Sequence, residues 1–340
     1  MKAFENKKKL ICGGALILFF IVVVCGLFLS AFSSVKGRAT IQIDGDDDAD
    51  SVRIKLERGA SPRQMIGFRI LSGVIGFKKM RPGCYDAGNG VSTLALFRNI
   101  HGGRQTPVNL TIPNVRTLGD LAGRLSAQLE LDSVQIISAL TDEKMCQEFG
   151  YDTTTIACMF IPNTYEVFWN ISAKDLMKRL HKESDAFWTA ARKAEALAAG
   201  LTPNEVIVMA SIVDQETTHV EEKPMVAGMY LNRLHRGMKL QADPTVKFAL
   251  KQFGLKRIMH EHLTVDSPYN TYRHEGLPPG PIAIPALSSI EAVLHYAHHD
   301  YIYMCAKEDF SGTHNFAKTY EEHMQNAKKY AEALNERGIK

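Results

Sequence analysis

The sequence predicts a mixed α+β protein with one transmembrane helix at its N-terminus, a small α+β unit and a larger α+β domain. Three observations predict this. Residues 10–32 contain no charged side chain, helix-type and strand-type apolar patterns alternate through the rest of the chain, and 340 residues suit roughly two domains. The net charge of +3 gives no reason to expect a nucleic-acid partner.

The uncharged run over residues 10–32 is long enough to cross a bilayer as a helix. Four lysines precede it, at Lys2, Lys7, Lys8 and Lys9, whereas only Lys36 and Arg38 follow closely. This bias places residues 1–9 in the cytoplasm and everything after the helix outside it. A signal peptide cleaved near Ser30 is the alternative, but such peptides usually have a shorter apolar region. We therefore expect an uncleaved anchor in the cytoplasmic (inner) membrane with a periplasmic or extracytoplasmic body.

After a linker at 33–39, the segment from 40 to 105 is predicted to form a small unit in which strands and helices alternate. We expect a strand at Ser51–Leu56 and helices near Ser61–Leu71 and Val91–Ile100, the last one ended by glycines. The acidic run between Asp44 and Asp50 lacks the spacing of an EF-hand, so a solvated turn is favoured over a calcium site.

Residues 106–340 form the predicted larger domain. It begins with a strand at Val108–Ile112 and helices around Thr117–Leu129 and Ser133–Leu140, and an amphipathic helix is expected over Lys174–Ala199. The aromatic segment Phe160–Trp169 follows a proline. Its rings could stack on sugars, although an ordinary core strand is favoured.

Glu216 ends an apolar helix that opens with a capping box at Thr202–Glu205. An apolar setting disfavours an ionised carboxylate and raises its pKa, as a general acid for glycosidic bonds requires. Asp214 lies on another face of the same helix, so periodicity does not choose between the two acids. A surface acid or a buried ion pair is the plain alternative for either residue.

A second helix is expected over Glu222–His235, where Asn232 and Arg233 could brace a neighbouring loop. Polar residues around Pro244 then form an irregular segment of the type that often binds ligands. An equally good reading is an Asp that caps a helix at Thr245–Leu250. The candidate ligand-binding residues of this segment are Gln241, Asp243 and Thr245.

The loop Ser267–Pro285 is rich in proline, which stiffens it and lowers the entropic cost of presenting polar groups. It presents Tyr269, Asn270 and Tyr272. A capping box at Ser288 and Glu291 is expected to open a helix that continues to about His298. Two hairpin strands, at Tyr301–Ala306 and Asn315–Phe316, and a helix capped by Thr319 and ended by Gly338 complete the chain.

Metal ligation and disulfides are not favoured. Five histidines lie between His295 and His323, but none has a zinc-protease spacing. The four cysteines outside the anchor have no Cys-x-x-Cys spacing. We expect them to be small buried apolar side chains, and disulfide formation is the alternative. We expect no metal and no cofactor. The cysteines concerned are Cys84, Cys146, Cys158 and Cys305.

Several motifs together resemble the endolytic murein transglycosylase family, also called YceG-like or MltG. The resemblance covers nearly the whole chain after the anchor and is strongest from 160 to 325. The matching segments are Pro162–Tyr165, Ala210–Thr217, Asn232–Leu234, Gly237–Val246, Ser267–Tyr272, Gly276–Gly280 and His314 with Phe316.

The resemblance implies a LysM-like module at 40–105 and a catalytic domain at 106–340. It implies cleavage of the β-1,4 bond between N-acetylmuramic acid and N-acetylglucosamine in nascent peptidoglycan, leaving a 1,6-anhydro end and terminating strand elongation. Glu216 matches the family's catalytic acid, and Asp214 stands where the family has another glutamate, which implies a supporting role. The expected partners are glycan strands, the membrane and cell-wall synthesis proteins, and nucleic acid is not among them.

Side-chain roles follow from this resemblance as hypotheses. Glu216 acts as the acid and then as the base of a non-hydrolytic cleavage, while six residues hold the sugar and His314 orients Glu216 or an acetamido group. The rivals are a hydrolase of the same bond, with Asp214 or Asp243 activating water, and a glycan-binding scaffold without activity. Besides His314, the expected binding residues are Gln241, Asp243, Thr245, Tyr269, Asn270 and Tyr272, and the supporting ones are Asp214, Asn232 and Tyr165.

Overall fold

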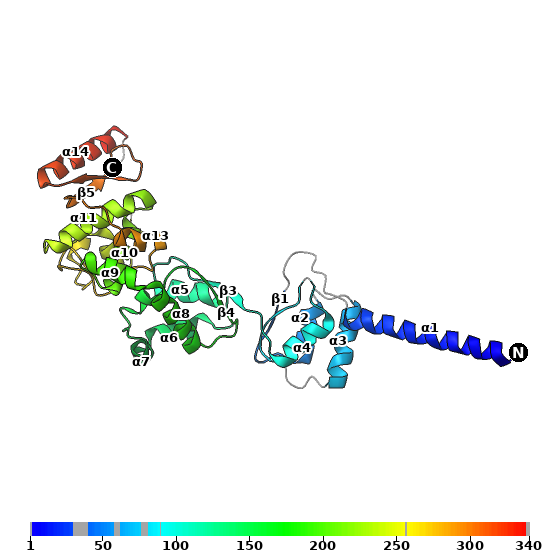
Figure 1. Ribbon diagram of the computed structural model, residues 1–340. Coiled ribbons are helices and arrows are strands. Elements are labelled where there is room, and N and C mark those ends of the chain that lie inside the picture. The colour runs from blue at the N-terminus through cyan, green and yellow to red at the C-terminus, as the bar shows by residue number, and fades with distance from the viewer. Residues whose placement is uncertain are drawn as a thin grey trace. The chain divides into compact units, whose positions relative to one another are not determined.

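The computed structural model describes residues 2–29, 40–57, 62–75, 81–88, 90–255 and 257–337. These form two compact units (Figure 1). Unit 1 consists of Met1–Leu110, Gln128–Glu130 and Glu166–Ile171, and unit 2 contains the other residues from Thr111 to Lys340. The division between the two units falls inside the strand Val108–Thr111, close to the boundary between residues 105 and 106 that we expect from the sequence. That the first unit is LysM-like stays a prediction.

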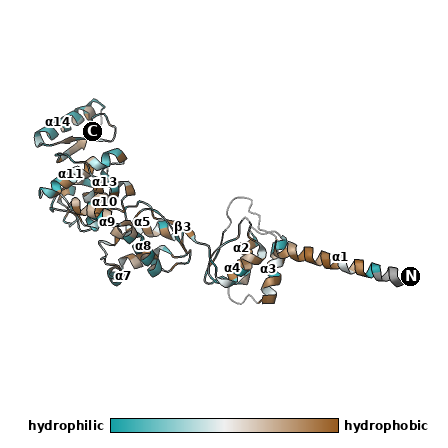
Figure 2. Cartoon of the chain, in the orientation of Figure 1, coloured by the Kyte–Doolittle hydropathy of each residue, from teal (hydrophilic) through white to brown (hydrophobic). Residues whose placement is uncertain are grey.

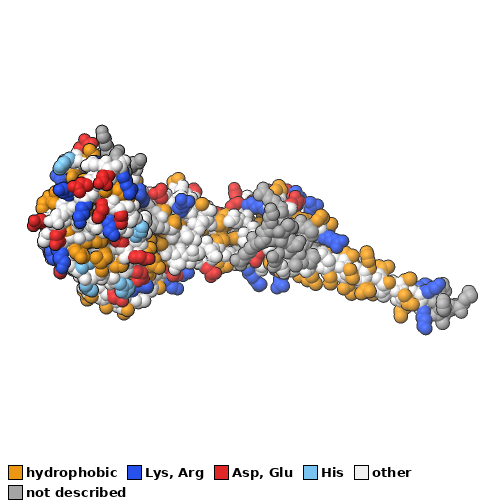
Figure 3. All heavy atoms as spheres, turned by 90° about the horizontal axis from the view of Figure 1, so that it is seen from above, with side chains coloured by type: hydrophobic (Ala, Val, Ile, Leu, Met, Phe, Trp, Pro, Cys, Tyr) orange, Lys and Arg blue, Asp and Glu red, His pale blue; other side chains and the backbone are white. Residues whose placement is uncertain are grey.

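Helix α1, Lys2–Phe28, contains a stretch of 22 residues, Lys7–Phe28, that is long and apolar enough to cross a membrane. None of this stretch is buried inside the protein. Figure 2 shows its apolar colour, and Figure 3 shows apolar side chains along it with lysines at its N-terminal end. These features agree with a single-pass anchor. The end of the expected span and the linker at 33–39 lie outside the described residues.

Unit 1 packs helices against a two-stranded antiparallel sheet in which Ile41 of β1 lies opposite Tyr85 of β2. The predicted helices near 61–71 and 91–100 are confirmed, and the left-handed Gly103 (φ 68°) ends the second of them. The core includes Ile43, Leu96 and Ile100, which are fully buried. The elements are β1 Thr40–Ile43, α2 Ala49–Glu57, α3 Pro62–Ile75, β2 Gly83–Asp86 and α4 Thr93–Gly102.

The strand expected at Ser51–Leu56 is wrong, because these residues belong to helix α2. The Asp48 carboxylate accepts hydrogen bonds from the Ser51 backbone N–H and hydroxyl, which starts the helix. Val52 and Leu56 are buried one turn apart, whereas Ile54 is exposed. Within the acidic run, the Asp44 and Asp47 carboxylates both form ion pairs with the Lys55 ammonium.

The next elements along the chain include β3, which pairs with β4, and the division between the units falls inside both strands. Along the segment 160–169, Phe160, Tyr165 and Trp169 are each buried and Phe168 is exposed, as an ordinary core strand requires. The elements are β3 Val108–Thr111, α5 Leu118–Ser126, α6 Ser133–Thr141, α7 Glu143–Glu148, η1 Ile156–Met159 and β4 Thr164–Val167.

The single helix expected over Lys174–Ala199 is wrong, because two helices occupy this range: α8, Ala173–Phe187, and α9, Ala190–Ala198. Trp188 leaves the helical conformation (ψ 67°) and is buried in the core. Thr189 then caps α9 by accepting a hydrogen bond from the Arg192 N–H. The amphipathic pattern continues through the break, so periodicity alone does not reveal it.

The core of unit 2 surrounds α10, Pro203–Glu216, whose residues 206–213 are all buried. Helices α11, Lys223–His235, and α13, Leu287–Leu294, pack against it, and α12, Asp243–Leu250, lies near its C-terminal end. The predicted capping box at Thr202 and Glu205 is confirmed. Two short 3-10 turns, η2 Val220–Glu222 and η3 His262–Thr264, interrupt the connecting loops.

The predicted capping box at Ser288 is wrong. Helix α13 has Ala286 at its N-cap with no side-chain cap bond, and it ends at Leu294 rather than near His298. Two partly buried interactions account for the difference: the Lys223 ammonium donates to the Ser288 hydroxyl, and Glu291 pairs with Arg192. Asp243 likewise makes no cap bond, because α12 starts with Ala242 at its N-cap.

The C-terminal hairpin is confirmed. Strand β5, Tyr303–Ala306, pairs with the antiparallel strand β6, His314–Ala317, and Met304 lies opposite Phe316. The capping box of Thr319 and Glu322 opens α14, Tyr320–Glu336, as predicted. Gly338, expected to end this helix, lies outside the described residues.

Candidate active site

Glu216 is the last residue of α10 and lies in a cavity of about 340 Å³. The buried helix and its N-terminal capping box fix the position of the backbone at this point. The cavity gathers residues from α11, α12, the proline-rich loop, the C-terminal hairpin and α14. Five residues expected in the site line it together: Glu216, Gln241, Asp243, Tyr272 and His314.

The pKa of the Glu216 carboxyl is raised to about 7. Burial is the main cause, because removing the carboxylate from water disfavours its charge. Asp243 raises the pKa further by repulsion, whereas the Tyr230 hydrogen bond and the positive charge of Lys247 lower it. Near neutral pH, Glu216 therefore exists in both protonated and ionised forms, as an acid that must later act as a base requires.

Tyr230 is the side chain held most closely to Glu216. Its hydroxyl donates a hydrogen bond of 2.5 Å to Glu216 Oε1. Burial and the Glu216 charge raise the pKa of Tyr230 well above its usual range, so this hydroxyl keeps its proton. The bond fixes one carboxyl oxygen, which leaves Oε2 as the oxygen for proton transfer.

Asp243 and Gln241 are each held by a neighbour. Asp243 accepts a hydrogen bond of 2.6 Å from the Tyr272 hydroxyl. Gln241 has a left-handed backbone (φ 53°), and its side-chain oxygen accepts a hydrogen bond from the Arg233 guanidinium. These contacts orient two polar side chains of the cavity before any ligand arrives.

Sequence reasoning missed several residues of the cavity, notably Tyr230, Tyr303 and His323, and it gave Arg233 only a bracing role. Arg233 Nε and His323 Nδ1 are buried without a hydrogen-bond partner among the described residues. A buried polar atom without a partner is costly, so both atoms are suited to a polar ligand. The sequence does contain one indication of these residues: Tyr230 and Arg233 are three positions apart, which places both side chains on the same face of α11.

Asp214 does not line the cavity and instead anchors α10. Its carboxylate lies 2.9 Å from the Lys223 ammonium, and each side chain is only 5% exposed. The Ser289 hydroxyl donates to the same carboxylate at 2.5 Å, and Asn114 donates at 2.6 Å. This is the buried ion pair that the sequence left open as one reading, and it accords with a supporting role.

Two residues expected to bind sugar, Thr245 of α12 and Asn270 of the proline-rich loop, are instead buried. Thr245 shares a hydrogen bond of 2.8 Å with Thr271. Asn270 is fully buried, donates to the carbonyls of Leu263 and Val265, and accepts from the Tyr272 N–H. It thereby positions Tyr272. Tyr269 lines a different cavity. For Thr245, Asn270 and Tyr269, direct contact with sugar in the Glu216 cavity stays a prediction.

The remaining expected residues have structural partners. His314 lines the cavity, but its ring nitrogen Nδ1 lies 3.1 Å from Glu222 rather than beside Glu216. Asn232 donates to the carbonyls of His299 and Tyr301 and so braces the start of the hairpin, as predicted for this side chain. Tyr165 is buried, with its hydroxyl bonded to the Ile161 carbonyl, and it does not line the cavity.

Within the described residues, no group of three or more His, Cys, Asp or Glu side chains is arranged to hold a metal ion. The cysteines described there form no disulfide with one another, and Cys84, Cys146 and Cys158 are buried. Burial raises the pKa of Cys158 to about 12, so this thiol is not reactive at neutral pH. The described lining of the Glu216 cavity holds carboxyl, hydroxyl, imidazole and guanidinium groups and the Cys305 thiol, whose pKa is raised by burial.

The chain resembles proteins of known name over most of its length. It is 28% identical to an endolytic murein transglycosylase of Bacillus subtilis, over 93% of both chains. It is 26% identical to a Streptococcus pneumoniae protein of that name, covering 86% of this chain and 58% of the longer relative. A crystal structure of a YceG-like protein from Listeria monocytogenes matches with a TM-score of 0.55 and 27% identity, covering 85% of this chain and 99% of that one.

The match to the YceG-like family model covers residues 41–329. This range includes both units after the anchor and every residue of the Glu216 cavity. The chain belongs to the YceG-like family.

Proposed function

We propose that this protein is a membrane-anchored endolytic lytic transglycosylase of peptidoglycan. It cleaves the β-1,4 bond between N-acetylmuramic acid and N-acetylglucosamine in nascent strands, leaves 1,6-anhydro ends and thereby terminates strand elongation. The observation that carries the proposal is Glu216, a carboxyl group that lines a polar cavity and whose pKa is raised to about 7. The family match and the names of the relatives support it.

In the first step, protonated Glu216 donates its proton from Oε2 to the glycosidic oxygen, and the bond from that oxygen to the muramoyl anomeric carbon breaks. The leaving sugar departs with a free hydroxyl, and Glu216 becomes a carboxylate. The Tyr230 hydrogen bond and the Lys247 charge favour this ionised form. The cavity therefore accommodates both the protonated form of Glu216 before the transfer and its ionised form afterwards.

In the second step, the 6-hydroxyl of the same muramoyl residue attacks its own anomeric carbon and gives its proton to Glu216. A 1,6-anhydro ring forms, and Glu216 returns to the protonated state without consuming water. Because nucleophile and electrophile belong to one sugar, positioning replaces the second carboxylate that hydrolytic glycosidases use.

Sugar binding falls to the polar groups that share the cavity with Glu216. Gln241, Asp243 and Tyr272 are prearranged acceptors and donors. The unpaired Arg233 Nε adds a donor for hydroxyl or acetamido oxygens, and the unpaired His323 Nδ1 donates or accepts according to its tautomer. Asp214 acts through the backbone of α10 and is a positioning residue.

Helix α1 supports a location for the protein in the cytoplasmic membrane. With Lys7, Lys8 and Lys9 at the N-terminal end of the apolar stretch, the N-terminus lies in the cytoplasm and the cavity faces the cell wall. Glycan binding by the first unit and contacts with cell-wall synthesis proteins belong to the same proposal.

The test is digestion of uncrosslinked nascent glycan with the purified full chain, followed by mass spectrometry. Wild-type protein should release fragments with anhydro-muramoyl ends, and Glu216→Gln should fold normally and release none. Wild-type product from the Glu216→Gln protein ends the proposal.

The hydrolase is the rival with structural support, because Asp243 lines the same cavity as Glu216 and could activate water. Its products carry reducing ends, one water heavier than anhydro ends, so the same spectra distinguish it. Asp214 is a poor candidate for this role because Lys223 and Ser289 already engage its carboxylate. Rescue of a cell-wall phenotype by Glu216→Gln would favour a scaffold.

A further inference from the structure

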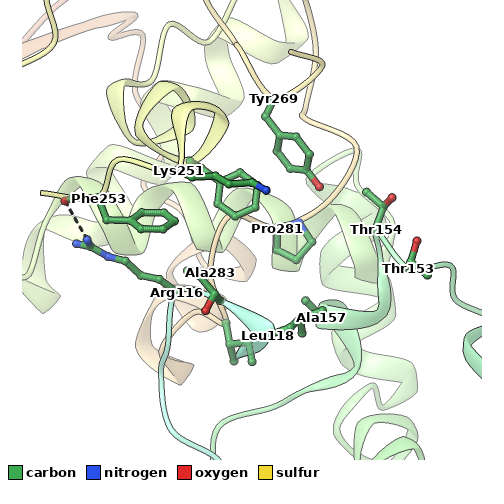
Figure 4. A pocket seen from close by; sticks show the side chains of 13 residues that line it. Arg116, Leu118, Thr153, Thr154, Ala157, Lys251, Phe253, Tyr269, Pro281 and Ala283 are labelled. Atoms are coloured by element: carbon green, nitrogen blue, oxygen red, sulfur yellow. Dashed lines mark hydrogen bonds between the residues drawn. The ribbon is translucent and has the colours of Figure 1, made fainter. Parts of the chain in front are cut away.

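A second cavity, of about 390 Å³, lies in unit 2 (Figure 4). The described residues that line it do not include Glu216 or any other residue of the Glu216 cavity. Its volume is in the range of small-ligand sites. Apolar side chains form most of its wall, and two cations, Arg116 and Lys251, also line it. The apolar lining is Leu118, Ala157, Phe248, Phe253, Pro281, Ala283 and Ile284.

Helix α12 connects the two cavities. Asp243, its first residue, lines the Glu216 cavity, and Phe248 and Lys251 line the second. A smaller cavity is lined by Pro244 and Lys247 of this helix and shares Phe248 with the second cavity. Eight residues of helix extend about 12 Å. Arg116 adds a direct link, because its Nε donates at 3.0 Å to Gln215, the neighbour of Glu216.

Lys251 is held in an unusual position. It caps α12 in the left-handed conformation (φ 56°), with its N–H bonded to the carbonyls of Lys247 and Phe248. In Figure 4 its side chain extends across the cavity towards the space between Tyr269 and Pro281. Burial raises the pKa of Tyr269 to about 12, so the Tyr269 hydroxyl remains a neutral donor. The nearby acid Asp152 already accepts hydrogen bonds from the Thr154 and Thr155 N–H groups.

We propose that this cavity binds the short acidic peptide attached to the lactyl group of N-acetylmuramic acid, while the sugar lies at Glu216. The proposal rests on the function proposed above. In peptidoglycan the sugars are neutral once the lactyl group is amide-linked, and the peptide carries the carboxylates that Arg116 and Lys251 match. The apolar side chains of the peptide match the apolar wall of the cavity, whereas the hydroxyl groups of a pyranose would find no hydrogen-bond partners there. An extended peptide of three or four residues spans about 12 Å.

The first experiment measures binding of the free acidic peptide to the full chain in detergent by isothermal calorimetry. Wild type should bind it saturably, and Lys251→Asn should weaken binding at least about fivefold, because Asn tolerates the left-handed conformation but lacks the charge. Thr154→Trp should fill the cavity and block binding. Lys193→Asn, an exposed lysine on α9 removed with the same charge change, should bind as wild type does.

The second experiment compares cleavage of peptide-bearing glycan with cleavage of the same glycan stripped by an amidase. Lys251→Asn should lower kcat/KM on peptide-bearing glycan about fivefold and leave the stripped substrate unchanged. Unsaturable binding in wild type, or equal affinity in wild type, Lys251→Asn and Thr154→Trp, overturns the proposal. If wild type binds the peptide but cleaves neither glycan, the proposed function fails while the peptide site stands.

Discussion

The Lys223 ammonium lies 2.9 Å from the Asp214 carboxylate, and both side chains are almost completely buried. Asp214 is two residues before Glu216, and Lys223 is the first residue of α11, the helix that carries Tyr230. The ion pair therefore ties the end of α10 to the start of α11. The hydrogen bond between Tyr230 and Glu216 depends on this alignment.

Lys223→Met should destabilise the protein strongly, because it leaves Asp214 as a buried charge without its cation. Removing one partner of a buried pair typically costs about 3–5 kcal/mol. Urea denaturation measures the loss, and the double variant Lys223→Met with Asp214→Leu should recover most of it. A single variant within about 0.5 kcal/mol of wild type would show that Ser289 and Asn114 suffice to hold Asp214.

The pH dependence of cleavage should move in opposite directions in two variants of the Glu216 surroundings. Activity requires protonated Glu216, so kcat/KM should fall as the pH rises through a pKa of about 7. Tyr230→Phe removes a hydrogen bond that lowers this pKa, so the fall should move to higher pH. Asp243→Asn removes a repulsion that raises it, so the fall should move to lower pH. Profiles of kcat/KM against pH measure both, and shifts in the same direction contradict this assignment.

Glu216→Gln should alter stability in a pH-dependent way. The pKa of Glu216 is about 7 in the folded protein against 4.5 ordinarily, so the unfolded chain loses the proton first as the pH rises. Wild type therefore loses stability between about pH 4.5 and pH 7, which the glutamine variant does not. From pH 4 to pH 8 the variant should gain about 1–3 kcal/mol relative to wild type. Thermal denaturation at both pH values checks this, and a constant difference refutes it.

The sequence is enough to identify Glu216 as a candidate catalytic acid. It gives no physical reason to prefer Glu216 over Asp214 for that role. Both acids end the same apolar helix, and helical periodicity treats them alike. The Lys223 ammonium that neutralises Asp214 is nine positions away, but the two neutral donors to this carboxylate are distant in sequence: Ser289 lies 75 positions away and Asn114 lies 100 away. Only the folded chain brings them together, whereas the caps at Thr202 and Thr319 were predictable because they are local.

The incorrect secondary-structure predictions have a common cause. In Ser51–Leu56, apolar residues at 52, 54 and 56 fit a strand, while 52 and 56 alone fit a helix, and burial of Val52 and Leu56 decides for the helix. Ser288 has the pattern of a cap, but the buried Lys223 ammonium is its partner. In each case a tertiary interaction overrides a local preference.

Two glycines should respond oppositely to a single methyl group. Gly228 lies inside α11, where an added Cβ would meet the Ala297 carbonyl oxygen at 2.3 Å and His299 Nε2 at 2.8 Å. Gly123 lies inside α5, where an added Cβ would meet nothing within 4 Å. The close approach at Gly228 lets the chain after α13 pack on α11, next to Tyr230.

Gly228→Ala should therefore destabilise the protein by about 1–3 kcal/mol through overpacking and should lower activity as α11 shifts. Gly123→Ala should stabilise it by about 0.5–1 kcal/mol, because alanine loses less conformational freedom in a helix. Urea denaturation of the two variants beside wild type, with anhydro-product formation as the second readout, compares the same substitution at the two sites. Equal stability changes in both variants would mean that α11 can move away from the Ala297 carbonyl at little cost, and Tyr230 would then not be held rigidly against Glu216.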